Sequence, residues 1–394
     1  MNIIFIAPKI NLSGGGSNSN TDLRIRTLQE RGHRVKAITL FSKYNKLPDY
    51  NPYEIIPFNK KPKHWILINL FVFKILKKYD KETDLFYVDG PQFLWGSGLY
   101  KLFYKKPVLI HLNVLPYTIL EHGTKFCAEI DKASGILNKT KSLVRTKMGG
   151  IIDRYFAKKI DAFTCTSPII KEHCVDFGFG EKNMHVIPEF IDTGIFTKRT
   201  KGQKDKKNQK KRLLYVGRLV ACKGVDVLIK ALERLNRKDI ELDIVGDGLE
   251  LEKLKKLAEK SGLDEQIHFH GWIKREMLGE IYSQADIFVH PARWAEPLGI
   301  TIVEAMSMGL PVIVPEISGS AWASGLAGLK FKNGNAEDLA NKIETLLDDD
   351  KLYQKLQGHT EQETEKMGYR KWTRKFENLI EELISLPRNN NLES

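Results

Sequence analysis

The sequence predicts an α/β protein with two doubly wound domains, and three observations support this expectation. The chain has 394 residues, more than one hydrophobic core usually organises. Short β-rich runs alternate with helix-length amphipathic segments, a pattern typical of parallel sheets that helices cover on both faces. The alternation stops at a strongly basic segment near residue 200 and then starts again.

The first domain is expected over residues 1–197. Its apolar, β-branched runs have the length of strands, and amphipathic segments of helical length lie between them. The expected strands are Ile3–Ala7, Val35–Leu40, Leu85–Val88, Val108–His111, Ala162–Thr166 and Met184–Ile187, and helices are expected at Ser19–Glu30 and Ile151–Lys159.

A basic segment over residues 198–212 separates the domains. It holds nine Lys or Arg and one Asp, so it supplies eight of the thirteen excess positive charges of the chain. A segment this polar cannot build a core, and we expect a solvated linker. A nucleic-acid-binding arm is the alternative, but the segment has no aromatic residues that could stack on bases.

The second domain is expected over residues 213–368, followed by a C-terminal helix over 369–386 that packs across the domains. The apolar residues of that helix recur at helical spacing from Trp372 to Leu383. Within the domain, the expected strands are Leu213–Val216, Ile240–Val245, Ile267–His270, Ile287–His290 and Val312–Val314, and the expected helices are Val225–Leu235, Leu249–Lys260, Met277–Gln284 and Ile300–Met308.

The composition indicates a folded, soluble protein of a reducing compartment. The four cysteines form no C-x-x-C pair, which argues against a disulfide framework and against a zinc site. The longest apolar run, Trp65–Phe73, is too short to span a bilayer. The N-terminal residues have the pattern of a strand and lack the features of a signal peptide. A cytoplasmic location is therefore expected.

Two loops at predicted strand ends have the composition of anion sites. Gly14, Gly15 and Gly16 lie between the first strand and the first helix, where glycines let backbone N–H groups approach a phosphate. A plain tight turn is the competing interpretation. Arg218 and Lys223 follow the first strand of the second domain, and together they could neutralise a diphosphate without a metal. Solvated surface cations are the alternative for this pair.

Two glutamates, Glu296 and Glu304, stand eight positions apart around the predicted start of an apolar helix. At the rise of an α-helix this spacing is about 12 Å, enough to contact different parts of one extended ligand. Glu304 is unusual in so apolar a segment, because a buried carboxylate needs partners. A surface glutamate on a half-exposed helix is the alternative.

The segment from Glu296 to Glu304 resembles the E-x7-E signature of the family 4 glycosyltransferases. These enzymes have the GT-B fold, in which two Rossmann-like doubly wound domains face each other across a cleft. The similarity covers nearly the whole chain in the expected order. Its other parts are Gly14–Gly16, Gly32–Val35, Val186–Asp192 with Phe196, Gly217–Arg218 with Lys223–Gly224, Val245–Gly248, Gly271–Trp272, Ala285–Asp286 and His290–Pro291.

The resemblance implies a donor site for a nucleotide-diphosphate sugar. Glu304 would hold the ribose, Glu296 would face the sugar ring, and Arg218 with Lys223 would clamp the diphosphate. The other donor-binding residues would be Gly14, Gly15, Gly16 and Gly246, together with Pro297, Leu298 and Gly299 at a helix N-terminus, whose N–H groups favour an anion.

His111, at the end of a predicted strand, would lie beside the reacting centre, so the expected catalytic residues are Glu296, Arg218, Lys223 and His111. An ordinary histidine at a strand end is the alternative for His111. The sequence also departs from the family at Pro188-Glu189-Phe190-Ile191-Asp192, where Pro-Asn-Gly-Val-Asp is usual.

The implied function is retaining transfer of a sugar from a nucleotide-diphosphate sugar to a glycan or lipid-linked acceptor. No metal cofactor is expected, and the D-x-D match at Asp348–Asp350 is interpreted as an acidic helix cap. A nucleotide-sugar epimerase and a non-catalytic nucleic-acid-binding protein are the alternatives.

The sequence gives one indication about the acceptor. Apolar residues with basic ends over His64–Lys78, and basic residues such as Lys141, Arg145 and Lys147, lead us to expect peripheral association with an anionic inner membrane surface. Ordinary helices that pack the first domain are the alternative.

Overall fold

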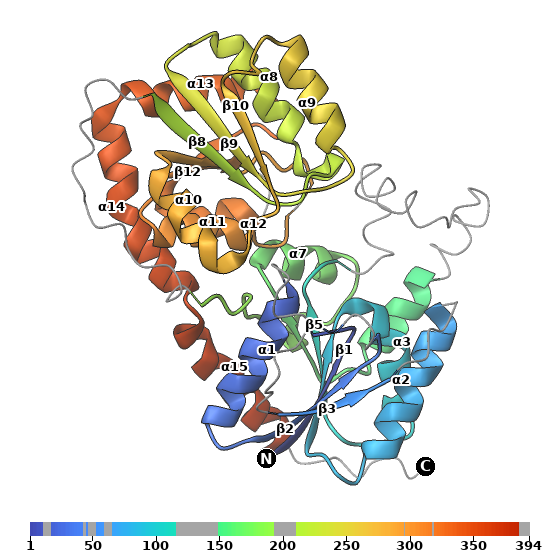
Figure 1. The fold of residues 1–394 in the computed structure, drawn as a ribbon. Helices are drawn as coiled ribbons and strands as arrows, with labels where there is room; N and C mark the ends of the chain where they lie inside the picture. Colours follow the sequence, from blue (N-terminus) through green and yellow to red (C-terminus); the bar gives the residue numbers. More distant parts are fainter. Residues whose placement is uncertain are drawn as a thin grey trace. The chain divides into compact units, whose positions relative to one another are not determined.

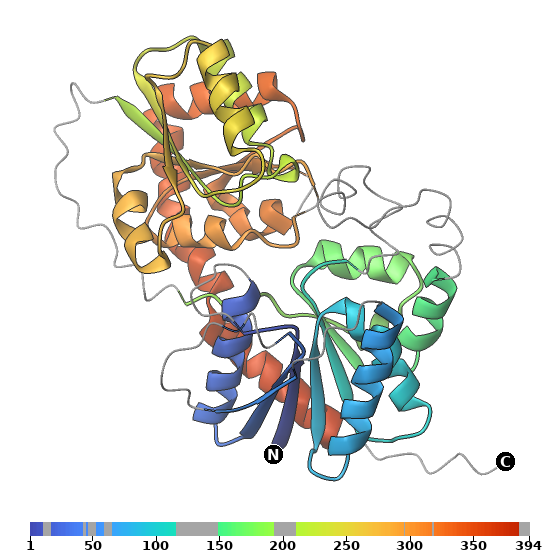
Figure 2. The ribbon, with the colours of Figure 1, turned by 45° about the vertical axis from the view of Figure 1, so that its right-hand side comes forward.

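The computed structural model describes residues 1–10, 17–41, 45, 53–58, 65–115, 149–192, 210–294, 296–316 and 319–385. These residues form two compact units (Figures 1 and 2). The first unit holds the described residues up to Phe190 and those from Tyr369 onward, and the second runs from Ile191 to Gly368. Both units are Rossmann-like, with a parallel sheet between layers of helices.

The first unit is built on seven described strands in the order β3-β2-β1-β4-β5-β6-β7, all parallel. Its inner strands are buried on both faces, which accounts for their nearly continuous apolar sequences. The strands are β1 (Asn2–Ala7), β2 (Arg34–Thr39), β3 (Glu54–Pro57), β4 (Leu85–Asp89), β5 (Val108–Leu112), β6 (Ala162–Cys165) and β7 (Met184–Val186).

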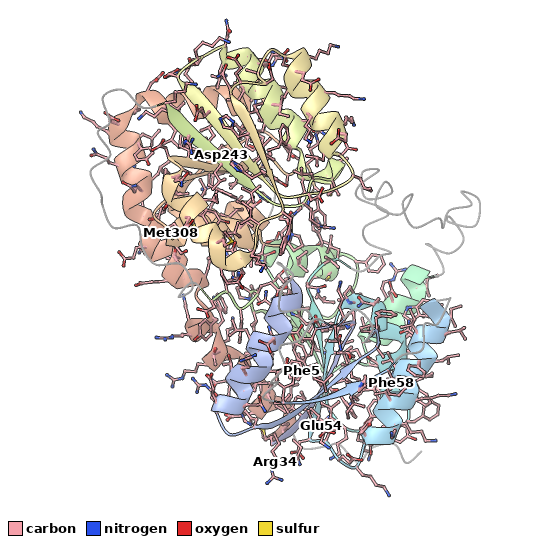
Figure 3. All side chains as sticks on the ribbon, in the orientation of Figure 1. Phe5, Arg34, Glu54, Phe58, Asp243 and Met308 are labelled. Carbon is pink, nitrogen blue, oxygen red and sulfur yellow. The ribbon has the colours of Figure 1, made fainter. Side chains whose placement is uncertain are left out.

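Helices cover both faces of the first sheet (Figure 1). On one face α1 (Ser17–Glu30) and α15 (Tyr369–Ser385) pack against alternate strand residues such as Ile3 and Phe5. Phe5, labelled in Figure 3, stacks on Tyr87 of β4 with ring centroids 4.2 Å apart. On the other face α2 (Trp65–Tyr79), α3 (Leu94–Lys101), a helix over 149–157 and α7 (Pro168–Asp176) pack against Ile4 and Ile6.

The second unit is built on six described strands in the order β10-β9-β8-β11-β12-β13, again all parallel. Its strands are β8 (Lys211–Val216), β9 (Ile240–Val245), β10 (Ile267–Gly271), β11 (Ile287–Val289), β12 (Val312–Pro315) and β13 (Gly328–Phe331). Its helices are α8 (Val225–Leu235), α9 (Leu251–Lys260), α10 (Leu278–Gln284), α11 (Ile300–Ser307), α12 (Gly319–Ser324), α13 (Ala336–Asp348) and α14 (Asp350–Met367).

The second sheet also has a core on each face. Helices α8, α9 and α13 bury one core, and α10, α11 and α12 bury the other. The acidic run Asp348–Asp350 joins α13 to α14. There Asp349 caps the start of α14, because its Oδ1 accepts a hydrogen bond from the N–H of Leu352 at 2.9 Å.

Most of the basic segment lies outside the described residues. Its last residues lead into β8, where Lys210 and Arg212 form ion pairs with Glu241 at 3.1 and 3.2 Å. The basic residues Lys141, Arg145 and Lys147 also lie outside the described residues. Among the helices that the structure describes, none has both the length and the hydropathy needed to cross a membrane.

Each sheet reverses its strand order at one point, between β1 and β4 in the first unit and between β8 and β11 in the second. In open parallel sheets, ligands bind beyond the carboxyl ends of the strands at this reversal. The loops that follow β8 and β11 therefore mark the place where a ligand of the second unit is expected.

Candidate active site

The loops after β8 and β11 hold most of the donor-site residues predicted for the second unit. The first loop runs from Gly217 through η4 (Ala221–Lys223) to Gly224, and the second runs from His290 to Gly299. Strands β8 and β11 are hydrogen-bonded neighbours, with Leu213 opposite Ile287. The fold thus brings Lys223 and Glu296 together although 73 positions separate them.

Glycines allow the backbone of these loops to pack closely. A Cβ on Gly224, which has φ +68°, would lie 2.1 Å from the carbonyl oxygen of Pro291. A Cβ on Gly246, at φ +139°, would lie 1.8 Å from the carbonyl oxygen of Gly217. Packing therefore requires glycine at both positions. A donor contact of Gly246 stays a prediction.

The carboxylate of Glu296 is the centre of a cluster of polar side chains. Lys223 forms an ion pair with its Oε2, and both side chains are largely buried. The indole N–H of Trp294 donates a hydrogen bond to the same oxygen at 2.8 Å. The ammonium of Lys223 lies 5.5 Å from the centroid of the Trp294 ring, within the range of a cation–π contact.

His290 completes the cluster from the end of β11. Its Nε2 lies 3.6 Å from Oε2 of Glu296, and the ring is almost fully buried. Burial by itself would raise the pKa of Glu296, but Lys223 and His290 outweigh burial and hold that pKa far below its ordinary value. Burial lowers the pKa of His290. The cluster therefore holds an ionised glutamate next to a neutral histidine.

Arg218 differs from Lys223 in its surroundings. Its side chain is exposed, and it forms no ion pair with any residue that the structure describes. Its backbone carbonyl accepts a hydrogen bond from the hydroxyl of Tyr215 at 2.9 Å, which fixes the loop beneath it. The backbone of Arg218 is thus fixed just after β8, and its guanidinium is exposed to solvent.

The N-terminus of α11 follows Glu296 directly. Gly299 caps it in a left-handed conformation with φ +86°. The N–H groups of Leu298 and Gly299 make no hydrogen bond within the described part of the chain. Such N–H groups at a helix start attract an anion. The loop rests on Gly319, where a Cβ would lie 1.9 Å from the carbonyl oxygen of Pro297.

Glu304, in the middle of α11, is buried and has two partners. Arg275 of η5 (Arg275–Met277) donates to its Oε1 from Nη2 at 2.9 Å and from Nε at 3.1 Å. The hydroxyl of Tyr282 lies 3.1 Å from its Oε2. Burial raises the pKa of Glu304, and these partners oppose the rise. Glu304 is therefore a buried carboxylate and not a surface glutamate on a half-exposed helix.

His111 lies in the first unit, at the end of β5, and only 1% of it is exposed. Its Nδ1 lies 2.9 Å from the hydroxyl of Thr164, and its Nε2 lies 3.5 Å from Glu189. Both ring nitrogens thus face side chains of the same unit. Gly14, Gly15 and Gly16 lie outside the described residues.

Four residues of the site were not singled out as site residues from the sequence. They are Trp294 and His290 beside Glu296, and Arg275 and Tyr282 beside Glu304. His290-Pro291 was part of the resemblance, but no role was attached to it. Arg275 and Tyr282 carry no local signal, because neither their neighbours nor their spacing marks them as partners of a distant carboxylate.

Two family models match the chain. The model described as glycosyltransferase family 4 matches residues 13–194, and the model described as glycosyl transferases group 1 matches residues 196–363. A lipopolysaccharide core biosynthesis glycosyltransferase, LpsE of Rhizobium meliloti, is 32% identical over 259 residues, which are 64% of this chain and 74% of that protein.

Solved structures are similar over almost the whole chain. Sucrose-phosphate synthase from Thermosynechococcus elongatus has a TM-score of 0.79 at 19% identity, covering 98% of this chain and all of that one. The Anabaena protein Alr3699/HepE, solved in complex with UDP, has a TM-score of 0.77 at 17% identity, covering 97% of this chain and all of that one. At this identity the likeness shows the GT-B fold. Together with the family models and the relative, it shows that this chain belongs to the family 4 glycosyltransferases and is a glycosyltransferase.

Proposed function

We propose that this glycosyltransferase takes a sugar from a nucleotide-diphosphate sugar and transfers it, with retention of anomeric configuration and without a metal, to a glycan or lipid-linked acceptor. The observation that carries the proposal is the cluster of Lys223, Glu296 and Trp294 beside the N-terminus of α11. The Anabaena structures, which contain UDP or UDP-glucose, support a nucleotide-sugar donor.

The leaving diphosphate determines what the protein must supply. Negative charge grows on the diphosphate as its bond to the anomeric carbon breaks, so fixed cations and N–H groups stabilise the transition state more than the ground state. Lys223 and Arg218 provide the cations. The N–H groups of Leu298 and Gly299 provide dipoles that need no reorganisation during the reaction.

Glu296 and Glu304 recognise different parts of the donor. Glu296 is ionised, so it accepts hydrogen bonds from the hydroxyls of the sugar ring. Lys223 and Trp294 hold that carboxylate through Oε2, which leaves Oε1 for the sugar. Glu304 accepts from the ribose, with Arg275 and Tyr282 keeping its position.

Retention follows when the acceptor oxygen attacks the face that the diphosphate leaves. The bond from the anomeric carbon to the diphosphate oxygen breaks, and a bond to the acceptor oxygen forms on the same side. The proton of the acceptor hydroxyl passes to the departing diphosphate oxygen. The step is balanced and needs no protein nucleophile.

A panel of nucleotide sugars tests the proposal. Binding of the correct donor raises the melting temperature, because it binds only the folded state. Transfer is then measured with glycan and lipid-linked acceptors, and proton NMR of the product gives its anomeric configuration. An inverted product contradicts retention. Conversion of the donor sugar to an isomer without an acceptor would instead identify an epimerase.

We also propose that the first unit binds an anionic membrane surface reversibly. On α2, Ile66, Leu67 and Leu70 are roughly half exposed, and the exposed Lys74, Lys77 and Lys78 follow within the next two turns. Neighbouring segments add the exposed apolar residues Phe103, Ile151 and Tyr155. Apolar side chains with a basic flank match the interface of an anionic leaflet.

Co-sedimentation with vesicles tests this second proposal. Binding should rise with the fraction of anionic lipid, fall with salt, and weaken in K77E/K78E on α2. The matched control is K253E/K255E on α9, which makes the same charge change on the second unit. No binding of the wild type to anionic vesicles at low salt would contradict membrane association.

A further inference from the structure

A buried arginine stands at the centre of a charged cluster in the first unit. Only 2% of Arg24, on α1, is exposed. Its guanidinium donates hydrogen bonds to the hydroxyl of Tyr87, to the carbonyl oxygen of Pro188 at 3.1 Å and to Oε2 of Glu189 at 3.4 Å. The rings of Tyr87, Phe190 and Phe376 surround it, with centroids 5.2–5.9 Å from its Cζ.

Glu189 joins this arginine to His111. Its Oε2 faces Arg24, and its Oε1 lies 3.5 Å from Nε2 of His111. On the other side of the ring, Nδ1 of His111 lies 2.9 Å from the hydroxyl of Thr164 on β6. The imidazole therefore lies between a carboxylate and a hydroxyl, and both groups come from its own unit.

The charges in the cluster determine which groups are ionised. Burial would raise the pKa of Glu189, but the Arg24 guanidinium and His111 outweigh it, and the pKa is lowered. Burial lowers the pKa of His111, and the nearby Arg24 lowers it further, so the pKa stays below its ordinary value although Glu189 and Asp89 oppose the shift. Glu189 is thus a carboxylate, and His111 is a neutral ring.

The other titratable groups that face His111 leave its ring neutral. Tyr87 of β4 lies beside the ring with its centroid 6.2 Å away, and burial raises its pKa, so it is neutral. Asp89, opposite His111 on β4, accepts a hydrogen bond from Thr21 at 2.5 Å, and burial raises its pKa.

A neutral imidazole carries its proton on one nitrogen only. The carboxylate of Glu189 can only accept, so a lone pair on Nε2 would repel it, whereas an N–H is attracted. The hydroxyl of Thr164 can donate as well as accept, so it can serve an unprotonated Nδ1. The arrangement favours the tautomer with the proton on Nε2.

We propose that Glu189, anchored by Arg24, is a positioning residue that fixes the orientation of the His111 ring and the tautomer that carries its proton on Nε2. His111 stays neutral, and it neither takes nor gives a proton during sugar transfer. The role in transfer rests on the proposed function.

Histidine NMR tests the tautomer without any substrate. In protein with ¹⁵N-labelled histidine, the signals of His111 are identified by their loss in H111Q. The wild type is expected to show the Nε2–H tautomer at neutral pH, and E189Q is expected to populate the Nδ1–H tautomer because its amide can donate to Nε2. The control E54Q removes an exposed carboxylate that pairs with Lys36 at 3.2 Å, and it should leave His111 unchanged.

Two results would overturn the proposal. One is an Nδ1–H or doubly protonated ring in the wild type, and the other is an unchanged tautomer in E189Q. If E189Q does not fold, the double variant R24M/E189Q removes both charges. It is expected to populate the Nδ1–H tautomer, as E189Q would.

Kinetics of H111Q test the second half of the proposal. Glutamine keeps hydrogen-bonding groups but cannot titrate, so kcat should fall by less than about tenfold, whereas loss of an acid or base costs roughly 100-fold or more. A folded H111Q that binds donor normally and loses 100-fold in kcat would show that His111 transfers a proton. Failure of every nucleotide sugar to bind the wild type would contradict the proposed function alone, because the NMR result does not depend on it.

Discussion

The ammonium of Lys223 and the carboxylate of Glu296 form an ion pair in which only 13% and 12% of the two side chains are exposed. One residue follows β8 and the other follows β11, the two strands between which the sheet reverses its order. Because the pair is largely withdrawn from water, each partner depends strongly on the other.

Replacing Lys223 by methionine should lower kcat by about 100-fold, because the variant loses a cation that stabilises the leaving diphosphate. It should also destabilise the protein, since Glu296 stays buried without its partner. In the double variant K223M/E296Q the melting temperature should recover, but kcat should not. Recovery of both would mean that Lys223 has only a structural role.

Arg218 should affect the chemical step more than stability. Its side chain is exposed, so R218A should melt near the wild-type temperature while its kcat at saturating donor falls. R218K keeps the charge but not the planar fork, and it should recover only part of the rate. A normal kcat for R218A would exclude Arg218 from the site.

Glu304 should act mainly on donor affinity. E304Q loses a charged acceptor for the ribose, and the donor dissociation constant should rise roughly tenfold to 100-fold. Isothermal titration with the donor measures it. E276Q, at the exposed residue next to Arg275, is the control and should bind normally. Equal affinity in E304Q and wild type would contradict ribose binding by Glu304.

The stabilising effect of Glu296 should disappear in acid. Its pKa is lowered in the folded protein, so its contribution is fully present above the ordinary glutamate value of 4.5 and declines as the pH falls below it. The melting temperature of wild type minus that of E296Q should therefore be constant from pH 7 to about pH 5 and then shrink. A melting-temperature difference that grows as the pH falls would contradict the predicted loss of stabilisation in acid.

Chelation should leave the reaction intact. The charge of the leaving diphosphate is assigned to Lys223, Arg218 and the N–H groups of α11, so transfer in excess EDTA should match the untreated rate. The assay is run with protein dialysed against EDTA. Activity that disappears and returns with magnesium or manganese would contradict metal independence.

Elements with a strong internal pattern could be predicted within a residue or two. β9 and α8 have the predicted bounds, because α8 repeats its apolar residues at helical spacing and β9 is nearly all buried. The edge strands β3 and β13 were missed. Each has four residues, and neighbouring strands stabilise them more than their own sequence does.

The residues proposed to bind the donor could be chosen from the sequence, since Lys223, Glu296 and Glu304 lie in segments whose order along the chain resembles a known family. Their partners could not. Trp294 contacts Glu296 through a local turn, and Arg275 reaches Glu304 from 29 positions away. Side-chain contacts across elements depend on how helices and strands pack, and spacing along the chain does not encode them.

The buried cluster of Arg24, Glu189 and His111 shows the same difference between what the sequence predicts and what only folding decides. The apolar pattern of Val108–His111 predicts that His111 ends a strand, and the resemblance to the family marks Glu189 as a departure from the usual Pro-Asn-Gly-Val-Asp. Their pairing with Arg24, on a helix 165 positions before Glu189, arises only when the chain folds α1 over the sheet. Burial there removes water, and without water a charge or proton is held by its nearest side chains.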